Sequence, residues 1–338
     1  MADLFSTNVM LGIVNSLVQT PQFLLDKFFP VIQTELTEEI HFDVIDKTRR
    51  LAPFVSPVVA GKIVQSRGYT TKTFKPAYIK DKRVFDNDRP FKRSAGEPIG
   101  GSLTPITRQQ ALLASELADQ TDMINRRLEV MAAEALRTGA VTVTGELYPT
   151  QNVNFGRDAG LTVTLTGGNR WGQAGINPLD SLQDWSQTIL KKSAAMPTDI
   201  VMDVDTWKVF RKNSEVEKRL DQFRGNTSLV RDAQITEGGV FMGNIDGYNI
   251  YVYAGWYVDD NNVEQPIIPS GTVLMGGAQI KGVRAFGAIR DEESGYQALP
   301  FYSKSWVEKD PSVRYLLMQS APLVVPERVN ASFAASVL

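Results

Sequence analysis

The stretch TPITRQQALLASELADQTDMINRRLEVMAAEALRTG, residues 104–139, predicts the longest regular element of this 338-residue chain. Thr104 can cap a helix, Pro105 suits its first turn, and Gly139 supplies a C-terminal stop. Within these limits one stripe repeats at steps of three and four and should face a core: Leu117, Thr121, Ile124, Leu128, Met131 and Ala135. The charged residues fall mostly on the other side: Arg126, Arg127, Glu129 and Glu134. Such a helix is roughly 50 Å long at 1.5 Å per residue, which suggests a spine.

A strongly basic segment precedes this helix and alternates in the period of a β-strand. Residues 62–93 hold ten Lys and Arg against three Asp, an excess of seven positive charges. We interpret residues 70–93 as a long two-stranded ribbon, with FDNDRP (85–90) as its turn. Because an isolated two-stranded hairpin is marginal in water, we expect this ribbon to rest on something outside itself.

Residues 1–45 hold short apolar pieces that Pro21 and Pro30 interrupt. They are too short and too separated to form a domain, so this arm needs a surface on its own body or on a neighbour's. The apolar stretch VMLGIVNSLV (9–18) is too short to cross a bilayer, and Asp3 precedes it where a signal peptide would carry Lys or Arg. We therefore expect a soluble protein without a signal peptide and with no membrane partner.

Composition limits the class of protein. The length exceeds the size at which single cores usually stop growing, about 250 to 300 residues, so two or more packed units are expected. Hydrophobic residues at 43% and charged residues at 22% are typical of globular proteins. The charge is nearly balanced, with 36 basic and 38 acidic residues, so the chain as a whole is not built to coat itself in nucleic acid. The absence of cysteine excludes disulfides and thiolate chemistry.

The second half of the chain mixes strands and helices. AVTVTGELYP (140–149) and NVNFGRD (152–158) alternate as strands. Asn177 and Pro178 open a helix that continues to about Ala195, and shorter helices are expected over 205–212 and 214–224. Further strands are predicted after these helices, among them residues 315–320.

Residues that could carry chemistry are few, and we expect no cofactor, no metal and no enzyme. The single histidine, His41, lacks the partners that a catalytic triad or most zinc sites need, and we interpret it as a structural or surface residue. Asp203 and Asp205 could be paired acids of a hydrolase, but their spacing also fits a helix cap, which we favour. DEES (291–294) is interpreted as a solvated turn. The Gly-rich pieces contain no phosphate-binding motif.

Nucleic-acid recognition as the main role is disfavoured. The aromatic run YNIYVYAGWY (248–257) could stack bases, but its alternation is also that of an ordinary half-buried strand. It lies far in sequence from the basic ribbon, and no known nucleic-acid motif is present. Passive proximity to DNA remains compatible with the sequence.

Five short stretches, in this order and at this spacing, resemble the major capsid proteins of lambda-like tailed phages. They are VSPVVAG (55–61), SRG (66–68), TGE (144–146), VNFGRD (153–158) and MQSAPL (318–323). The resemblance covers nearly the whole chain, and the five stretches together are more specific than any one of them alone.

The resemblance implies an α+β fold, the Hong Kong 97-type phage capsid fold. Its parts correspond here to an N-terminal arm, an extended β loop, a peripheral domain with the spine helix, an axial domain, and C-terminal strands that return to the peripheral domain. Their expected ranges are 1–45, 46–100, 101–176, 177–295 and 296–338. The implied function is a shell subunit that assembles through pentamers and hexamers around the double-stranded DNA of a tailed phage. The alternative within this fold is an encapsulin-like compartment that encloses cargo proteins.

The resemblance also suggests what surrounds the basic ribbon. We expect its cations to meet carboxylates of an adjacent copy, with the following contact candidates: Arg67, Lys72, Lys75, Lys82, Arg83 and Arg89. Exposed ion pairs contribute only about 0 to 1 kcal/mol each, so their repetition over many copies matters more than any one of them. Further expected partners are a decoration protein, a scaffold, a portal and, without specificity, the packaged DNA. Because the lambda-like branch is associated with a decoration protein, we expect no Lys-Asn crosslink between copies. The expected location is the virion capsid, after assembly in the host cytoplasm.

Overall fold

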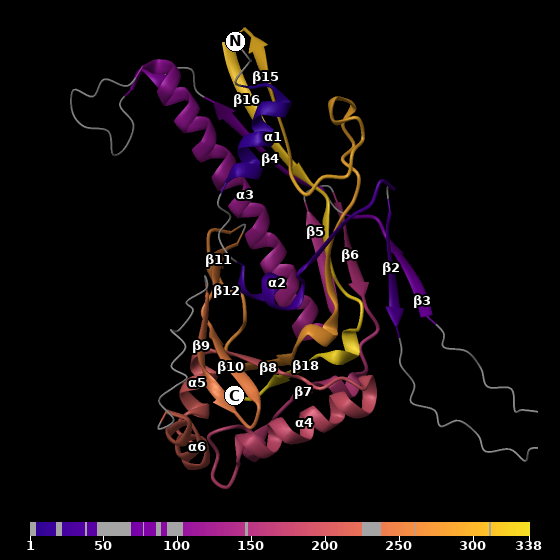
Figure 1. The fold of residues 1–338 in the computed structure, drawn as a ribbon, viewed down its shortest axis with the longest axis vertical. Helices are drawn as coiled ribbons and strands as arrows, with labels where there is room; N and C mark the ends of the chain where they lie inside the picture. The colour runs from indigo at the N-terminus through magenta and orange to yellow at the C-terminus, as the bar shows by residue number, and fades with distance from the viewer. Residues whose placement is uncertain are drawn as a thin grey trace, which may run out of the picture.

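A computed structural model describes most of the chain, and α3 (Pro105–Thr138) is its long central element. Figure 1 shows α3 in the upper part of an elongated molecule, with a mixed sheet and further helices below it. The described residues are 5–17, 22–37, 39–45, 69–76, 78–85, 89–92, 104–145, 148–224, 238–259, 261–310 and 312–338.

The spine helix begins and ends as predicted. The Thr104 side chain accepts a hydrogen bond from the Thr107 N–H at 3.2 Å, and Gly139 takes the left-handed conformation with φ 72°. A Cβ at Gly139 would lie 2.5 Å from the Cβ of Arg157, so this position requires glycine for space as well as for φ. All six residues of the predicted stripe are buried. The prediction for Glu129 is wrong, because its side chain is buried with 1% exposure.

A three-stranded antiparallel sheet accompanies the upper half of the molecule, in the order β15 (Tyr302–Lys309), β16 (Ser312–Ser320), β4 (Ile79–Phe85). β3 (Tyr69–Phe74) pairs instead with β2 (Ile40–Ile45). The predicted ribbon of residues 70–93 is therefore wrong, because its two strands pair with different partners. β4 lies against β16, which contains buried apolar residues. The alternating pattern of β4 could not predict this partner.

A second three-stranded sheet joins the arm to the end of the chain. β1 (Val31–Thr34) runs parallel to β14 (Gly282–Phe286), which pairs antiparallel with β17 (Pro322–Pro326). β1 is an edge strand, and all four of its residues are exposed.

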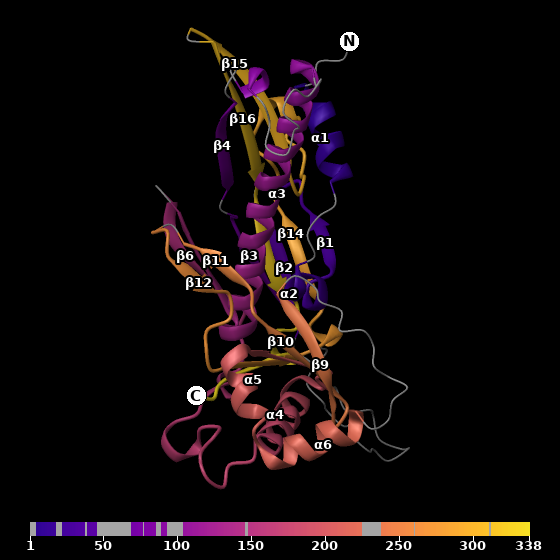
Figure 2. The same ribbon diagram turned by 90° about the vertical axis from the view of Figure 1, so that its left-hand side faces the viewer.

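The lower part of the molecule contains a six-stranded mixed sheet with helices packed against it (Figures 1 and 2). We call it the axial sheet, because most of its strands fall in the range expected for the axial domain. The strands in spatial order are β7 (Thr162–Thr164), β18 (Phe333–Ser336), β13 (Thr272–Gly276), β8 (Asp199–Asp203), β10 (Tyr248–Tyr253) and β9 (Gly239–Ile245). β8 and β13 are buried along their whole length. β7 and β18 lie outside the expected axial range of 177–295, so the sheet draws on both flanking parts of the chain.

The helices of this part match the sequence expectation. They are α4 (Pro178–Ser193), α5 (Val204–Phe210) and α6 (Ser214–Arg224). The Asn177 side chain caps α4 by accepting the Leu179 N–H at 3.2 Å. Two hairpins project beside α3: β5 (Ala140–Gly145) with β6 (Tyr148–Asn154), and β11 (Trp256–Val258) with β12 (Glu264–Pro266). The 3-10 turns are η1 (Arg89–Phe91), η2 (Ala159–Leu161), η3 (Gly167–Asn169), η5 (Ala278–Ile280), η6 (Glu292–Ser294) and η7 (Val329–Ala331).

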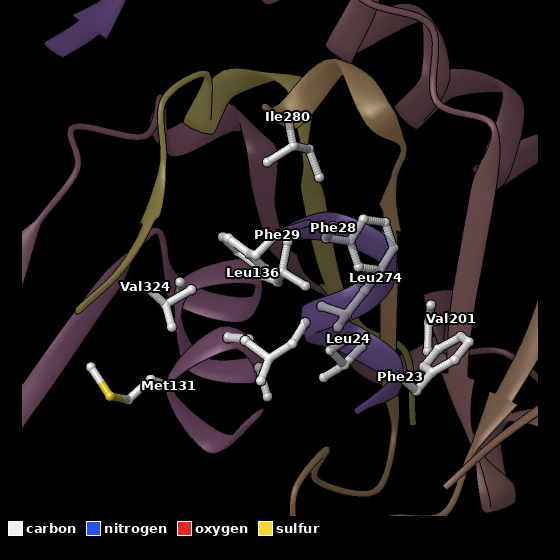
Figure 3. Close-up of a cluster of buried hydrophobic side chains, with 14 of the residues drawn as sticks. Phe23, Leu24, Phe28, Phe29, Met131, Leu136, Val201, Leu274, Ile280 and Val324 are labelled. Carbon is white, nitrogen blue, oxygen red and sulfur yellow. The ribbon is translucent and has the colours of Figure 1, made fainter. Parts of the chain in front are cut away.

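The arm packs on its own body through two helices, α1 (Thr7–Ser16) and α2 (Phe23–Phe28). α1 contacts α3 and β15, and α2 contacts α3. Figure 3 shows α2 between Met131 and Leu136 of the spine helix on one side and Val201 of the axial sheet on the other. Of the two surfaces that the sequence left open for the arm, the described residues use the body of the same chain. α2 thus lies where the spine helix meets the axial sheet, inside the larger of the two apolar clusters found among the described residues.

Candidate intersubunit contact site

Arg83 and Arg89 converge on one carboxylate of the spine helix. Arg83 Nη1 lies 2.7 Å from Glu116 Oε2, and Arg89 Nη1 lies 2.8 Å from Glu116 Oε1. Arg83 Nε also pairs with Asp81 at 3.0 Å. Burial opposes ionisation of Glu116, but the two guanidinium groups hold its pKa below its ordinary value. α3 of the same chain thus supplies one carboxylate to both arginines, and their contact with another copy stays a prediction.

Lys82 lies on the opposite face of β4 and contacts aromatic rings. Its ammonium nitrogen is 4.0 Å from the centroid of Tyr315 and 5.3 Å from that of Trp306. The first distance is well within the range of a cation–π interaction. Lys82 is nevertheless an exposed residue and is accessible to solvent or to another chain.

The remaining candidates belong to the segment around β3. Lys72 Nζ donates to the Asn154 carbonyl at 2.6 Å, and the Lys75 carbonyl accepts from the Tyr148 hydroxyl at 3.0 Å. These contacts attach the β2–β3 strand pair to the β5–β6 hairpin. Arg67 and the VSPVVAG and SRG stretches lie outside the described residues. The described candidates thus lie on or just after β3 (Lys72 and Lys75), on β4 (Lys82 and Arg83) and in η1 (Arg89), and their role between subunits stays a prediction.

A buried carboxylate that the sequence placed on the wrong side of α3 anchors the arm. Glu129 accepts hydrogen bonds from the backbone N–H groups of Leu24 at 2.7 Å and Leu25 at 3.0 Å, and from the Tyr253 hydroxyl at 3.0 Å. Burial raises the pKa of Glu129 to about 7 despite these three donors. Asn125 and Ala132, which lie one turn away on each side of Glu129, are buried as well.

Charged contacts hold α2 from two further directions. Lys27 Nζ lies 2.8 Å from Asp199 of β8 and 2.8 Å from the Tyr251 hydroxyl of β10. Arg284 of β14 pairs with Asp26 at 2.6 Å and donates to the Phe29 carbonyl at 2.7 Å. Together with Glu129, these contacts tie the arm helix to the spine, the axial sheet and the β14 sheet.

The residues considered for chemistry have structural roles. Asp203 caps α5 by accepting the N–H groups of Asp205 at 2.9 Å and Thr206 at 3.2 Å, which confirms the predicted cap. Asp205 pairs with Lys208 at 2.9 Å, on the surface. Asp291 forms an ion pair with Lys304. The described residues include no cluster of three or more side chains suited to hold a metal ion. The helices described include none both long and apolar enough to cross a membrane.

Comparison with known proteins gives consistent relatives along the whole chain. The major capsid proteins of Escherichia phages lambda and N15 are each 28% identical to it over 329 residues, which cover 96% of both chains. The major capsid protein of Enterobacteria phage phi80 is 29% identical with the same coverage.

Solved structures show the same fold. A capsid protein of a prophage of E. coli CFT073 superposes with a TM-score of 0.78 at 22% identity, covering 98% of this chain and 99% of that one. The capsid of Ralstonia phage GP4 gives a TM-score of 0.54 at 12% identity, covering 90% and 85% of the two chains. The predicted α+β capsid fold of the Hong Kong 97 type is confirmed. The family model for phage major capsid protein E matches residues 6–337, and the chain therefore belongs to that family.

Proposed function

We propose that this chain is the major capsid protein of a tailed phage, which assembles through pentamers and hexamers into an icosahedral shell around double-stranded DNA. The observation that carries this proposal is the match of the family over residues 6–337, together with capsid proteins as relatives over 96% of the chain. The capsid fold supports it independently of sequence identity.

The structure supports a role in which the subunit is folded before it meets its neighbours. The arm, the spine and the axial sheet share one core, so the single chain has a body that can dock as a unit. Outside this core, edge strands such as β1 and β4 carry exposed apolar side chains, including Ile32 and Val84. Exposed apolar edges of this kind are suited to contact with other copies.

The finer assignments belong to the same proposal. The candidate contact residues around β3, β4 and η1 act between subunits as well as within them, since Lys82 and Lys75 stay exposed beside their intrachain contacts. A decoration protein, a scaffold and a portal complete the particle, and no Lys-Asn crosslink joins its subunits. Packaged DNA lies close to the shell without a specific site. The subunit is not an enzyme, and it assembles in the host cytoplasm and stays in the virion.

An encapsulin-like compartment is the second candidate within the same fold. The encapsulin complex of Synechococcus elongatus PCC 7942 superposes with a TM-score of 0.50 at 11% identity, which shows a shared fold alone. The relatives at 28% identity are phage capsid proteins, and this favours the phage assignment.

Electron microscopy of the purified protein tests the proposal. We expect closed icosahedral particles from the recombinant chain, alone or with its scaffold, and particles from infected or induced cells that contain nuclease-protected DNA. Particles filled with protein cargo instead of DNA would support the encapsulin-like alternative. A chain that stays monomeric at all concentrations, with and without the scaffold, would contradict both.

A further inference from the structure

A groove runs along the outer side of the spine helix, facing the β11–β12 hairpin. Its volume is about 760 Å³. The α3 side contributes residues three and four apart, which form one outward stripe, and the hairpin supplies the other wall. The lining residues are Met123, Arg126, Arg127, Val130, Trp256, Tyr257, Val258 and Glu264. We call this feature the arginine groove.

The lining combines apolar surface with positive charge. Met123, Trp256 and Val258 are each more than half exposed, which is unusual for large apolar side chains gathered at one place. Arg126 and Arg127 are both exposed beside them, and Arg126 has no ion pair within the part of the chain that the structure describes. The groove therefore suits a segment that carries both apolar side chains and carboxylates.

Such a segment is present on the other flank of the same molecule. Val31, Ile32 and Leu36 are more than half exposed, and Glu35 and Glu39 accompany them; we call these five residues the acidic edge. No Lys or Arg occurs between residues 28 and 46.

The geometry of the acidic edge prepares it for docking. Glu35 is oriented by the Gln33 side chain at 3.1 Å and by the His41 N–H at 3.0 Å. β1 pairs only with β14 among the described strands, so its outer edge is open. Extended backbone with exposed apolar side chains is the usual form of a strand that docks on another chain.

We propose that the arginine groove receives the acidic edge of a second copy of this chain. Figure 2 shows β11 and β12 on one side of α3 and β1 on the other, so the contact cannot be made within one molecule and joins neighbours head to tail. Repeated heterologous contacts close into rings when the rotation between neighbours closes, and a pentamer or hexamer is such a ring. The inference rests on the proposed shell function and adds to it the pair of surfaces that meet.

A phosphate backbone is the other occupant that arginines can attract. The observations favour a protein segment, because four of the eight lining residues are Met, Val or Trp and because Glu264 stands in the wall. A strand with apolar side chains can fill that surface, whereas a DNA backbone cannot.

A charge swap tests the contact. Arg126→Glu and Glu39→Arg should each lower the yield of particles by at least about tenfold, because each places like charges together. The double variant restores the opposite pair and should recover most of the yield. Arg211→Glu, on an exposed arginine after α5, is the matched control and should assemble like the wild type. Single variants that assemble normally, or a double variant that is not rescued, would overturn the proposal.

Cysteine crosslinking gives a second, independent readout, since the chain has no cysteine of its own. In wild-type-like particles, the combination Leu36→Cys with Val258→Cys should give oxidised ladders up to pentamers and hexamers, and neither single variant should do so. Closed particles without ladders would overturn the proposal and leave the shell function standing, whereas a wild type that forms no particles with or without the scaffold refutes that function. A 30-base-pair DNA duplex that binds the wild type but not Arg126→Glu, with assembly unchanged, would assign the groove to nucleic acid and also overturn the proposal.

Discussion

Helix α2 and strand β1 are separated by only two residues of the arm, yet they have opposite environments. The four apolar residues of α2 are buried, whereas all four residues of β1 are exposed. Glu129, Lys27 and Arg284 attach α2 to three other elements, while β1 is held by backbone pairing along one edge. The difference teaches that the arm has an anchor, which belongs to the folded subunit, and an edge, which is available to a neighbour.

The largest expected effect comes from removing the anchor's main apolar contact. Phe28→Ala should lower the free energy of unfolding by about 3–5 kcal/mol, because it leaves a cavity between the spine helix and the axial sheet. Ile32→Ala, four residues further on, should change it by less than about 0.5 kcal/mol. Urea unfolding of the unassembled chain measures both values. Similar losses in the two variants would refute the contrast between anchor and edge.

The next effect concerns the polar part of the anchor. Glu129→Ala leaves two backbone donors and the Tyr253 hydroxyl without an acceptor in a buried place, and should cost about 2–3 kcal/mol. Glu134→Ala, on the same helix but partly exposed, is the control. It should cost less than about 1 kcal/mol, because surface substitutions usually have small effects on stability. Chemical denaturation at pH 6 separates the two. Equal small effects would mean that the apolar contacts alone seat α2.

The anchor should also respond to pH. The folded-state pKa of Glu129 is raised to about 7 from an ordinary 4.5, so the folded chain holds this proton more tightly than the unfolded chain does. Its contribution to stability is full below the unfolded pKa and is lost as the pH rises through 7. Relative to Glu129→Gln, the wild type should therefore lose about 2 kcal/mol between pH 5 and pH 8. Unfolding curves of both proteins across this range measure the stability of the wild type relative to Glu129→Gln. A relative stability that stays constant or increases as the pH rises would contradict the assignment.

The smallest effect concerns β4, an edge strand that is partly anchored by charge. Glu116→Gln weakens the contacts to Arg83 and Arg89, whose side chains are about a quarter and a half exposed, and should cost about 1 kcal/mol or less. The loss should be smaller still in about 0.5 M salt, because salt screens the attraction between exposed charges. A double-mutant cycle with Arg83→Ala measures the coupling. A loss of several kcal/mol would contradict this prediction and would mean that the ion pairs of Glu116 anchor β4 as strongly as the buried contacts anchor α2.

Local signals in the sequence were sufficient for α3, α4, α5 and α6, whereas α1 and α2 of the arm were not predicted as helices. Thr104 and Gly139 mark the ends of α3, Asn177 opens α4, and Asp203 caps α5, because each of these devices acts within a few residues. The resemblance to lambda-like capsid proteins supplied the overall fold, which local signals could not.

Contacts between distant segments were beyond the sequence. The partner of β4 is β16, more than 200 residues away, and alternation within β4 says nothing about which strand it meets. Glu129 was placed outside because a charged residue usually faces solvent, and its three donors come from α2 and β10. The arginine groove was missed for the same reason, since α3 and β11–β12 are also far apart in the chain.

Hydrogen exchange measured by mass spectrometry on free subunits and on assembled particles tests the central claim most directly. Peptides covering α2 should exchange slowly in both states, and peptides covering β1 should exchange fast in free subunits and slow down on assembly. Slow exchange of β1 in the free subunit, or an α2 that becomes protected only in particles, would contradict the account.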